Sequence, residues 1–260
     1  MGMLDGRIAL ITGGGKGIGK GIALKFAKEG AKVAIGCNSN AGMAAETLEE
    51  LKKYTDAILI QSDVGTPEGC HKLVDETVKA FGGIDIYVNN AALQCNDSLL
   101  EQRDMSHFNR ELTVNVRAAM LMFQYTLPYL KKSEHARVIV VTSVHGKRPF
   151  TADPCYSMSK ACLKMLYREA AVEFLPYGIS VNAIAPGGVK IEFKTGQDPN
   201  GHAAVWRSMK KVDRSARPRY YGINGMPSDC AEMACFIAAY PTLYLTGSTL
   251  RLDGGGSLLL

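Results

Sequence analysis

Short apolar runs alternate with longer amphipathic stretches along most of the chain, and this alternation constrains the fold more than any other feature. A short apolar run suits a buried strand, whereas apolar residues spaced by three and four suit a helix that covers a sheet. The alternation is typical of a parallel sheet with helices on both faces. We therefore expect an α/β fold with one doubly wound parallel sheet of about seven strands. The expected strands are 8–12, 32–36, 57–61, 84–88, 137–142, 179–184 and 249–252, and the expected helices are 18–29, 41–54, 68–81, 114–130 and 156–175.

Length and composition favour a single globular domain spanning 1–260. Of the 260 residues, 47% are hydrophobic and 21% are charged, which supports a sizeable core and excludes a disordered chain. The 7 cysteines include no C-x-x-C pair, which argues against a disulfide framework and against a zinc site. No signal-peptide pattern is present, and no apolar stretch reaches the roughly 18 residues of a membrane span. We expect a soluble protein of the reducing cytoplasm that binds no metal and no membrane.

The excess positive charge is concentrated in residues 188–220. This stretch has 8 basic and 3 acidic residues, whereas the rest of the chain has 22 of each, for a formal net charge of +5. So small an excess does not predict nucleic-acid binding. Residues 188–225 also interrupt the alternation directly after an expected strand, where open α/β sheets bind ligands. We predict a substrate lid there, with Trp206 as a candidate substrate contact; a solvated loop or a subunit contact is the alternative.

A glycine-rich turn joins the first expected strand to the first expected helix. Glycines let the backbone take positive φ and approach a pyrophosphate, which the positive end of the helix dipole attracts. This strand–turn–helix context predicts a dinucleotide cofactor. The turn follows Thr12 and contains Gly13, Gly15, Lys16, Gly17, Ile18 and Gly19.

The residues after the second expected strand favour NADP(H) over NAD(H). In NAD enzymes an acidic residue about 20 positions past the glycines bonds the ribose 2′-hydroxyl. Here Asn38 and Ser39 stand in that region, so no carboxylate repels a 2′-phosphate. Both side chains offer hydrogen-bond donors to a phosphate, and Lys16 offers a cation. If Lys16 is only a solvated turn residue, both cofactors bind.

Tyr156 and Lys160 are four residues apart at the start of an expected helix, so that their side chains share one face. A phenol with a pKa of about 10 is a poor base at neutral pH, but a nearby ammonium and a positive nicotinamide lower that pKa. Tyr156 is then suited to take a proton from an alcohol, or to donate one to a carbonyl. Ser143, at the end of an expected strand, is placed to hydrogen-bond the reacting oxygen.

In this order and spacing, the motifs resemble the short-chain dehydrogenase/reductase family along essentially the whole chain. The resemblance implies a Rossmann-type fold, an enzyme that acts on CH–OH groups with a nicotinamide cofactor, and a homo-oligomer, commonly a tetramer or a dimer. Besides the glycine turn, the motifs are Asp63-Val64, Asn89-Asn90-Ala91-Ala92, Asn115, Ser143, Tyr156-x-x-x-Lys160, Pro186-Gly187 and Asp253-Gly254-Gly255.

The resemblance also implies roles for single residues. Asp63 and Val64 flank the adenine, and Lys160 holds the nicotinamide ribose. Asn115 perturbs its helix and positions a water that relays protons through Lys160. Ala92 stands where the family usually has glycine, and Ile191 where many members have a threonine that bonds the nicotinamide amide. The residues implied to line the rest of the cofactor groove are Asn90, Ala91, Ala92, Tyr156, Pro186, Gly187 and Val189.

The segment 143–147 is also similar to its counterpart in the glucose dehydrogenases of this family. If it is extended, His145 points the same way as Ser143 and meets a substrate hydroxyl; a solvent-facing histidine is the alternative. We predict an NADP(H)-dependent oxidoreductase that interconverts a secondary alcohol and a carbonyl on a sugar, polyol or related hydroxylated small molecule. The basic lid favours an anionic substrate. A 3-oxoacyl carrier-protein reductase and a non-catalytic NADP(H)-sensing protein are the alternatives.

Overall fold

The computed structural model describes residues 2–39, 41–95, 100, 104–149, 153–190 and 225–258. Its strands form one seven-stranded sheet in the order β3-β2-β1-β4-β5-β6-β7, and every neighbouring pair is parallel. The predicted doubly wound sheet is therefore confirmed. The strands are β1 (Ile8–Thr12), β2 (Lys32–Cys37), β3 (Ala57–Gln61), β4 (Ile86–Asn89), β5 (Arg137–Val141), β6 (Ser180–Pro186) and β7 (Thr249–Leu252).

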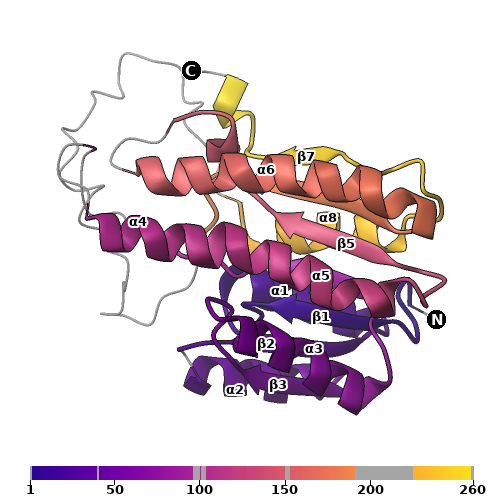
Figure 1. Cartoon of the computed structure of the whole chain (residues 1–260). Coiled ribbons are helices and arrows are strands. Elements are labelled where there is room, and N and C mark those ends of the chain that lie inside the picture. The colour runs from indigo at the N-terminus through magenta and orange to yellow at the C-terminus, as the bar shows by residue number, and fades with distance from the viewer. Residues whose placement is uncertain are drawn as a thin grey trace.

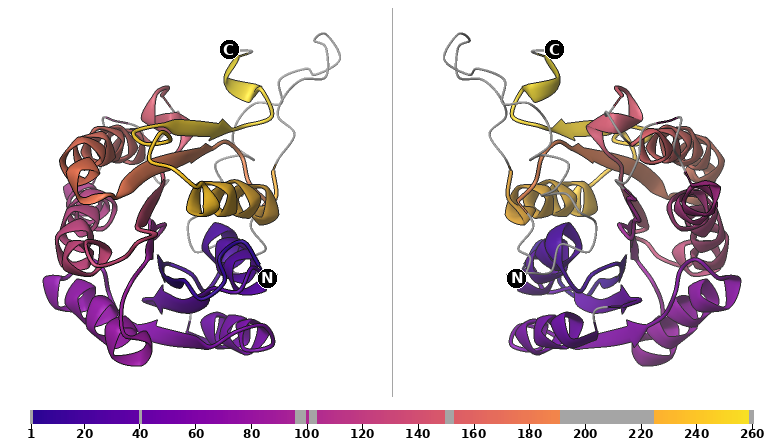
Figure 2. Two further views of the ribbon diagram at one scale, coloured as in Figure 1. Left: turned by 90° about the vertical axis from the view of Figure 1, so that its right-hand side faces the viewer. Right: turned by 90° about the vertical axis from the view of Figure 1, so that its left-hand side faces the viewer.

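Helices cover both faces of the sheet (Figures 1 and 2). One face packs against α1 (Gly17–Lys28), α2 (Ala41–Leu51) and α8 (Pro227–Ala239). The other packs against α3 (Pro67–Phe81), α5 (Ala118–Leu130) and α6 (Pro154–Phe174). The central strands are buried on both faces, which explains why their sequences are continuously apolar rather than alternating.

Two helical regions differ from the sequence prediction. The expected helix 114–130 is wrong at its start: α4 (Met105–Leu112) precedes it, and a π-helical turn at Thr113–Arg117 joins α4 to α5. Helix α4 was not predicted because its only fully buried side chain is the charged Glu111. Helix α8 was also not predicted, because alanines and cysteines make up most of its buried face and give little apolar periodicity.

The strand order reverses at β1, which has β2 on one side and β4 on the other. In open α/β sheets, ligands bind beyond the carboxyl ends of the strands at this switch point. The loops after β1, β4 and β5 therefore surround the expected ligand-binding site. Among the described helices, none is both long and apolar enough to cross a membrane.

Candidate active site

The turn after β1 is tied to the loop after β4 by the side chains of Thr12 and Asn90. Thr12 Oγ1 accepts the backbone N–H groups of Asn90 and Ala91 at 3.0 and 3.1 Å. In return, Asn90 Nδ2 donates to the carbonyl oxygens of Thr12 and Gly13 at 2.9 and 3.0 Å. These bonds fix the backbone on both sides of the switch point. Thr12 had no assigned role in the sequence prediction, although it opens the glycine motif.

The glycines of the turn are required by close approach and by backbone conformation. Gly13 has φ +64°, a region that other residues rarely adopt. A Cβ on Gly19 would lie 2.2 Å from the Gly13 carbonyl oxygen and 2.5 Å from Asn90 Nδ2. The turn thus forms a cradle of bare backbone that side chains would fill.

The N-terminus of α1 fits a pyrophosphate. Lys16 is its N-cap and makes no side-chain cap hydrogen bond, and the first turn, which is wholly described, holds no acidic residue. Neither the N-cap side chain nor an acidic residue of the first turn occupies this end of the helix, where the helix dipole favours an anion. Gly14 N donates to Gly36 O at 3.1 Å, which holds this turn against the end of β2. The glycine turn therefore fits the phosphates of a dinucleotide.

At the end of β2, Asn38 and Ser39 are exposed. The Asn38 carbonyl oxygen accepts a hydrogen bond from Gln61 Nε2 at 3.3 Å. The Asn38 side chain acts to lower the pKa of Asp63 in the loop after β3. Asn38 and Asp63 thus belong to one cluster of polar side chains.

The predicted catalytic residues gather at the carboxyl end of β5. Ser143 begins the loop after β5, and its hydroxyl acts to lower the pKa of Tyr156 in the first turn of α6. Lys160 is only 2% exposed, and its Nζ lies 5.5 Å from the centroid of the Tyr156 ring. The Lys160 ammonium donates to the Val141 carbonyl oxygen at 3.0 Å. The structure therefore brings Ser143, Tyr156 and Lys160 together.

Burial shifts the pKa of both titratable groups in this cluster. It raises the pKa of Tyr156 to about 12; the negative charges of Asp153 and Glu111 also raise it, whereas the hydrogen bond with Ser143 lowers it. Burial lowers the pKa of Lys160 to about 8. At neutral pH the unliganded site therefore holds a protonated phenol, which is suited to donate a proton to a carbonyl oxygen.

Asn115 lies in the π-helical turn, which agrees with the expectation that this residue perturbs its helix. Its side chain is 1% exposed and bonds Leu93 twice, donating to the carbonyl oxygen and accepting from the N–H, both at 2.8 Å. It also donates to Ser159 Oγ at 2.9 Å. Ser159 in turn donates to the carbonyl oxygen of Tyr156 at 2.8 Å. Asn115 thereby connects the loop after β4 to the catalytic helix.

Two buried carboxylates extend this connection. Gln94 donates to Asp153 at 2.5 Å, and the Cys95 N–H donates to Glu111 at 2.5 Å. Both carboxylates belong to residues that are 0% exposed. With Asn115, they hold three consecutive residues of the loop after β4. Sequence reasoning missed both acids, although Asp153 lies three residues before Tyr156 and a charged residue so close to an expected catalytic group was a usable signal.

His145 does not lie on an extended segment, so the argument that it points in the same direction as Ser143 is wrong. Residues Val144–Gly146 form a 3₁₀ turn, and Ser143 Oγ accepts the His145 N–H at 3.2 Å. The Ser143 hydroxyl caps the turn, which is why the strand does not continue. Burial also lowers the pKa of the imidazole, which favours its neutral form.

The remaining predicted residues lie at other parts of the same edge of the sheet. Pro186 pairs with Leu252, and Gly187 N donates to Leu252 O at 2.8 Å. Val189 forms a β-bridge with Gly225, which brings together the two ends of the segment 191–224. That segment, including Trp206, lies outside the described residues. Within the described ranges, no cluster of three or more His, Cys, Asp or Glu is arranged to hold a metal ion.

Comparisons with known proteins agree with this arrangement. A family model described as short chain dehydrogenase matches residues 7–200. The chain is 32% identical over 257 residues to glucose 1-dehydrogenase 2 of Bacillus subtilis, covering 98% of this chain and 96% of that one. It is 33% identical over 256 residues to the 2,5-dichloro-2,5-cyclohexadiene-1,4-diol dehydrogenase LinX of Sphingobium indicum, covering 98% of both.

A solved structure is similar along nearly the whole chain. It is a short chain dehydrogenase from Burkholderia cenocepacia in complex with NADP, with a TM-score of 0.83 and 30% sequence identity. The alignment covers 98% of this chain and 99% of that one.

Proposed function

Because the chain belongs to the short-chain dehydrogenase family, we propose that it is an NADP(H)-dependent oxidoreductase that interconverts a secondary alcohol and a carbonyl. The observation that carries this proposal is the cluster of Ser143, Tyr156 and Lys160 at the carboxyl end of β5. It lies at the same edge of the sheet as the glycine cradle after β1. A cradle for phosphates and a proton-transfer group at one edge suit hydride transfer between a dinucleotide and a bound substrate.

The proposed cofactor contacts follow the geometry of the edge. The backbone of the glycine turn holds the pyrophosphate, and Asn38, Ser39 and Lys16 hold the 2′-phosphate. Asp63 and Val64 lie against the adenine. The NADP complex of the Burkholderia relative supports the preference for NADP(H). The cofactor supplies or accepts the hydride when it is bound. The other proposed contacts are Asn90, Ala91, Ala92, Pro186, Gly187 and Val189.

In the proposed mechanism, Tyr156 exchanges a proton with the substrate oxygen. In carbonyl reduction the protonated phenol donates its proton, and the Ser143 hydroxyl hydrogen-bonds the same oxygen. In alcohol oxidation Tyr156 must be ionised, so its pKa of about 12 has to fall. The ammonium of Lys160 favours the ionised phenol, and the positive charge of an oxidised nicotinamide would favour it further when the cofactor is bound. Asn115 holds the loop after β4 and connects it to the helix that carries both residues.

The proposed substrate is a hydroxylated small molecule such as a sugar or polyol. The names of the two relatives denote activity on glucose and on a cyclohexadiene diol, both of which carry hydroxyl groups. His145 and Trp206 remain candidate substrate contacts. The basic segment adds the proposal of an anionic substrate. Replacing Arg214 and Arg217 by Gln should then raise KM for an acid substrate but not for an uncharged analogue; equal effects on both would remove this part of the proposal.

The test follows NADPH and NADH absorbance against a panel of sugars, sugar acids, polyols, ketones and acyl thioesters. We expect turnover that prefers NADPH and that falls by about two to four orders of magnitude in Tyr156→Phe. Tyr244→Phe is the matched control, since Tyr244 is 95% exposed and should leave the rate unchanged. Turnover that survives in Tyr156→Phe contradicts the mechanism. Fastest turnover of an acyl thioester favours the carrier-protein reductase, and NADPH binding without any turnover favours a sensing protein.

A further inference from the structure

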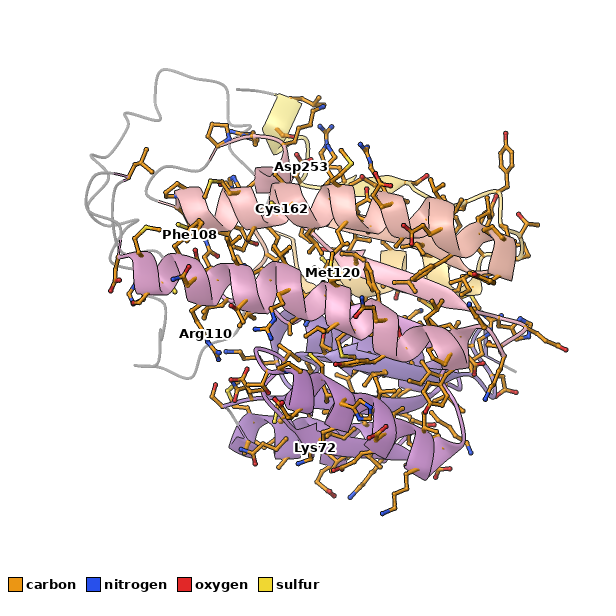
Figure 3. The ribbon with its side chains drawn as sticks, in the orientation of Figure 1. Lys72, Phe108, Arg110, Met120, Cys162 and Asp253 are labelled. Atoms are coloured by element: carbon orange, nitrogen blue, oxygen red, sulfur yellow. The ribbon has the colours of Figure 1, made fainter. Side chains whose placement is uncertain are left out.

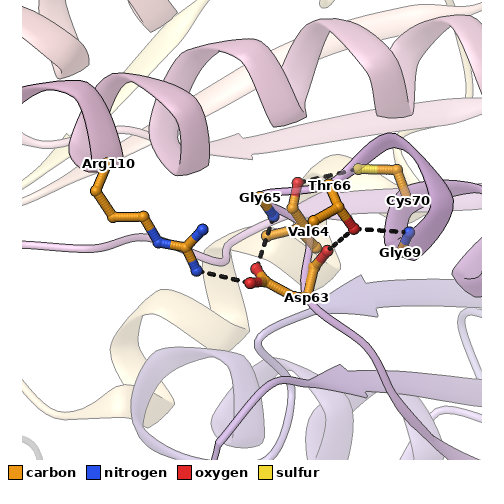
Figure 4. Close-up of polar contacts among 7 residues, drawn as sticks. All are labelled: Asp63, Val64, Gly65, Thr66, Gly69, Cys70 and Arg110. Carbon is orange, nitrogen blue, oxygen red and sulfur yellow. Dashed lines mark hydrogen bonds and ion pairs between the residues drawn. The ribbon is translucent and has the colours of Figure 1, made fainter.

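Arg110 of α4 reaches the loop after β3 and forms an ion pair with Asp63 (Figures 3 and 4). Arg110 Nη2 lies 2.7 Å from Asp63 Oδ2. The other carboxylate oxygen accepts the Gly65 N–H at 2.8 Å, so that both oxygens are held. The Arg110 and Asp63 side chains are 43% and 30% exposed, which leaves the pair open to solvent and to a ligand.

Gly65 provides the space in which the guanidinium lies. A Cβ on Gly65 would be 2.5 Å from Arg110 Nη1 and 3.1 Å from its Cζ. Gly65 is not among the glycines with positive φ, so its backbone conformation does not require glycine. A Cβ there would also lie 3.0 Å from Asp63 Oδ1, so a side chain at this position would press on both members of the ion pair.

The same carboxylate lies close to the proposed cofactor site: the Asn38 carbonyl oxygen accepts a hydrogen bond from Gln61, two residues before Asp63, and the Asn38 side chain acts to lower the pKa of Asp63. Burial acts to raise the pKa of Asp63, but the hydrogen bonds of Arg110 and Gly65 outweigh it and leave the pKa below its usual value. Asp63 is therefore ionised at neutral pH. Without Arg110, a negative charge would stand unbalanced next to Asn38 and would repel a phosphate, which carries a charge of about −1.5 to −2.

We propose that Arg110 determines cofactor specificity as a positioning residue: its ion pair with Asp63 holds and neutralises the carboxylate beside Asn38 and so permits a 2′-phosphate there. This inference rests on the proposed function, because it deepens the proposed NADP(H) site. Residues at the end of β2 supply no positive charge near the proposed 2′-phosphate site. In the inference, Arg110 of α4 supplies it through its ion pair with Asp63 in the loop after β3. The ion pair thus offsets an acid that NADP(H) would otherwise meet.

The test measures dissociation constants for NADPH and NADH by fluorescence titration at low salt. In Arg110→Gln we expect NADPH affinity to fall by about tenfold and NADH affinity by less than about twofold. The reason is that only NADPH places a phosphate near the carboxylate of Asp63, which is then no longer neutralised. High salt should shrink the difference. Arg110→Lys keeps the charge and should retain most of the preference.

Lys72→Gln is the matched control. Lys72 is an exposed lysine of α3 that donates to the Gln61 carbonyl oxygen at the end of β3, and its replacement removes the same charge from the same region (Figure 3). We expect neither dissociation constant to change in this variant. A loss of NADPH preference equal to that of Arg110→Gln would mean that net charge, rather than the pair with Asp63, sets the preference, and would overturn the inference.

Two further variants test the pair itself. The double variant Asp63→Asn with Arg110→Gln should restore the ratio of the two affinities, since the repelling carboxylate is gone. Gly65→Ala should lower the preference for NADPH without any change of charge, by pushing the guanidinium away from Asp63. If the wild-type protein binds both cofactors and the ratio of their dissociation constants is unchanged in Arg110→Gln, only this inference is overturned. Wild-type protein that binds neither overturns the proposed function and the inference with it.

Discussion

Lys160 is a charged side chain in a place that disfavours its charge. It is 2% exposed, it donates to one carbonyl oxygen, and burial lowers its pKa from 10.5 to about 8. In the unfolded chain the ammonium is solvated, so the folded state bears a penalty whenever Lys160 is protonated in both states. The protein therefore keeps a destabilising residue at the site, as expected where proton transfer requires it.

Replacing Lys160 by Met should raise the free energy of unfolding near pH 7 by about 1–3 kcal/mol, after allowance for the lost hydrogen bond. The sign follows from proton binding: between about pH 8 and 10.5 the unfolded wild-type chain binds more protons than the folded one, so wild-type stability rises with pH there. The advantage of Lys160→Met should therefore shrink across this window. Urea unfolding at pH 7 and pH 10 measures both effects. A variant that is less stable than wild type at pH 7 would contradict this account.

At the scale of elements, the strands were predictable and two helices were not. β1, β3 and β7 have the predicted bounds, since turn residues on both sides limit these short segments to the length of a strand. Helix α4 was not predicted, because its buried residue is the charged Glu111. Helix α8 was not predicted, because small side chains form most of its buried face. The contacts that hold these two helices in place are therefore seen only in the tertiary structure.

The contact between α1 and α8 depends on Gly21. A Cβ at Gly21 would lie 2.8 Å from the Pro227 carbonyl oxygen. Gly21→Ala should therefore destabilise the protein by about 1–3 kcal/mol through overpacking, although alanine favours helices. Gly42→Ala in α2 is the control, because nothing lies within 4 Å of its Cβ, and it should stabilise by up to about 1 kcal/mol. Thermal unfolding of the two variants compares them directly, and the same sign of change in both would contradict the packing argument.

At the scale of the whole molecule, the parallel sheet gathers residues that lie far apart in sequence. Spacing predicted Ser143, Tyr156 and Lys160, and the resemblance to the family added Asn115. The fold connects these four residues at one edge of the sheet. The position of Asp153, three residues before Tyr156, was a usable signal, but its hydrogen bond with Gln94 is seen only in the fold. Glu111 could not be predicted, because a buried carboxylate far from any motif is recognised only when its hydrogen-bond donor is seen. The single domain, the lid and the subunit assembly remain predictions.

The resemblance to the family predicts a homo-oligomer with α6, the helix that carries Tyr156, and the last strand, β7, at interfaces. Met165 and Val172 of α6 are 57% and 72% exposed, which suits burial against another subunit. We expect light scattering to give a mass of two or more times 28.1 kDa, the mass of one chain, and we expect Val172→Glu to reduce that mass. Tyr54→Glu, at an exposed aromatic residue beyond α2, should leave the mass unchanged. A monomeric wild-type protein would contradict the prediction.

The bridge between Val189 and Gly225 has a consequence for how this protein can evolve. Gly225 accepts the Lys190 N–H and donates to the Gly188 carbonyl oxygen, both at 2.9 Å, so the chain just after β6 and the chain just before α8 are joined to each other. Insertions, deletions and exchanges between these two anchors need not shift the strands or the catalytic helix. Natural variation can therefore act on this stretch separately, and if the stretch is the predicted substrate lid, such changes would alter the substrate and leave the catalytic helix in place.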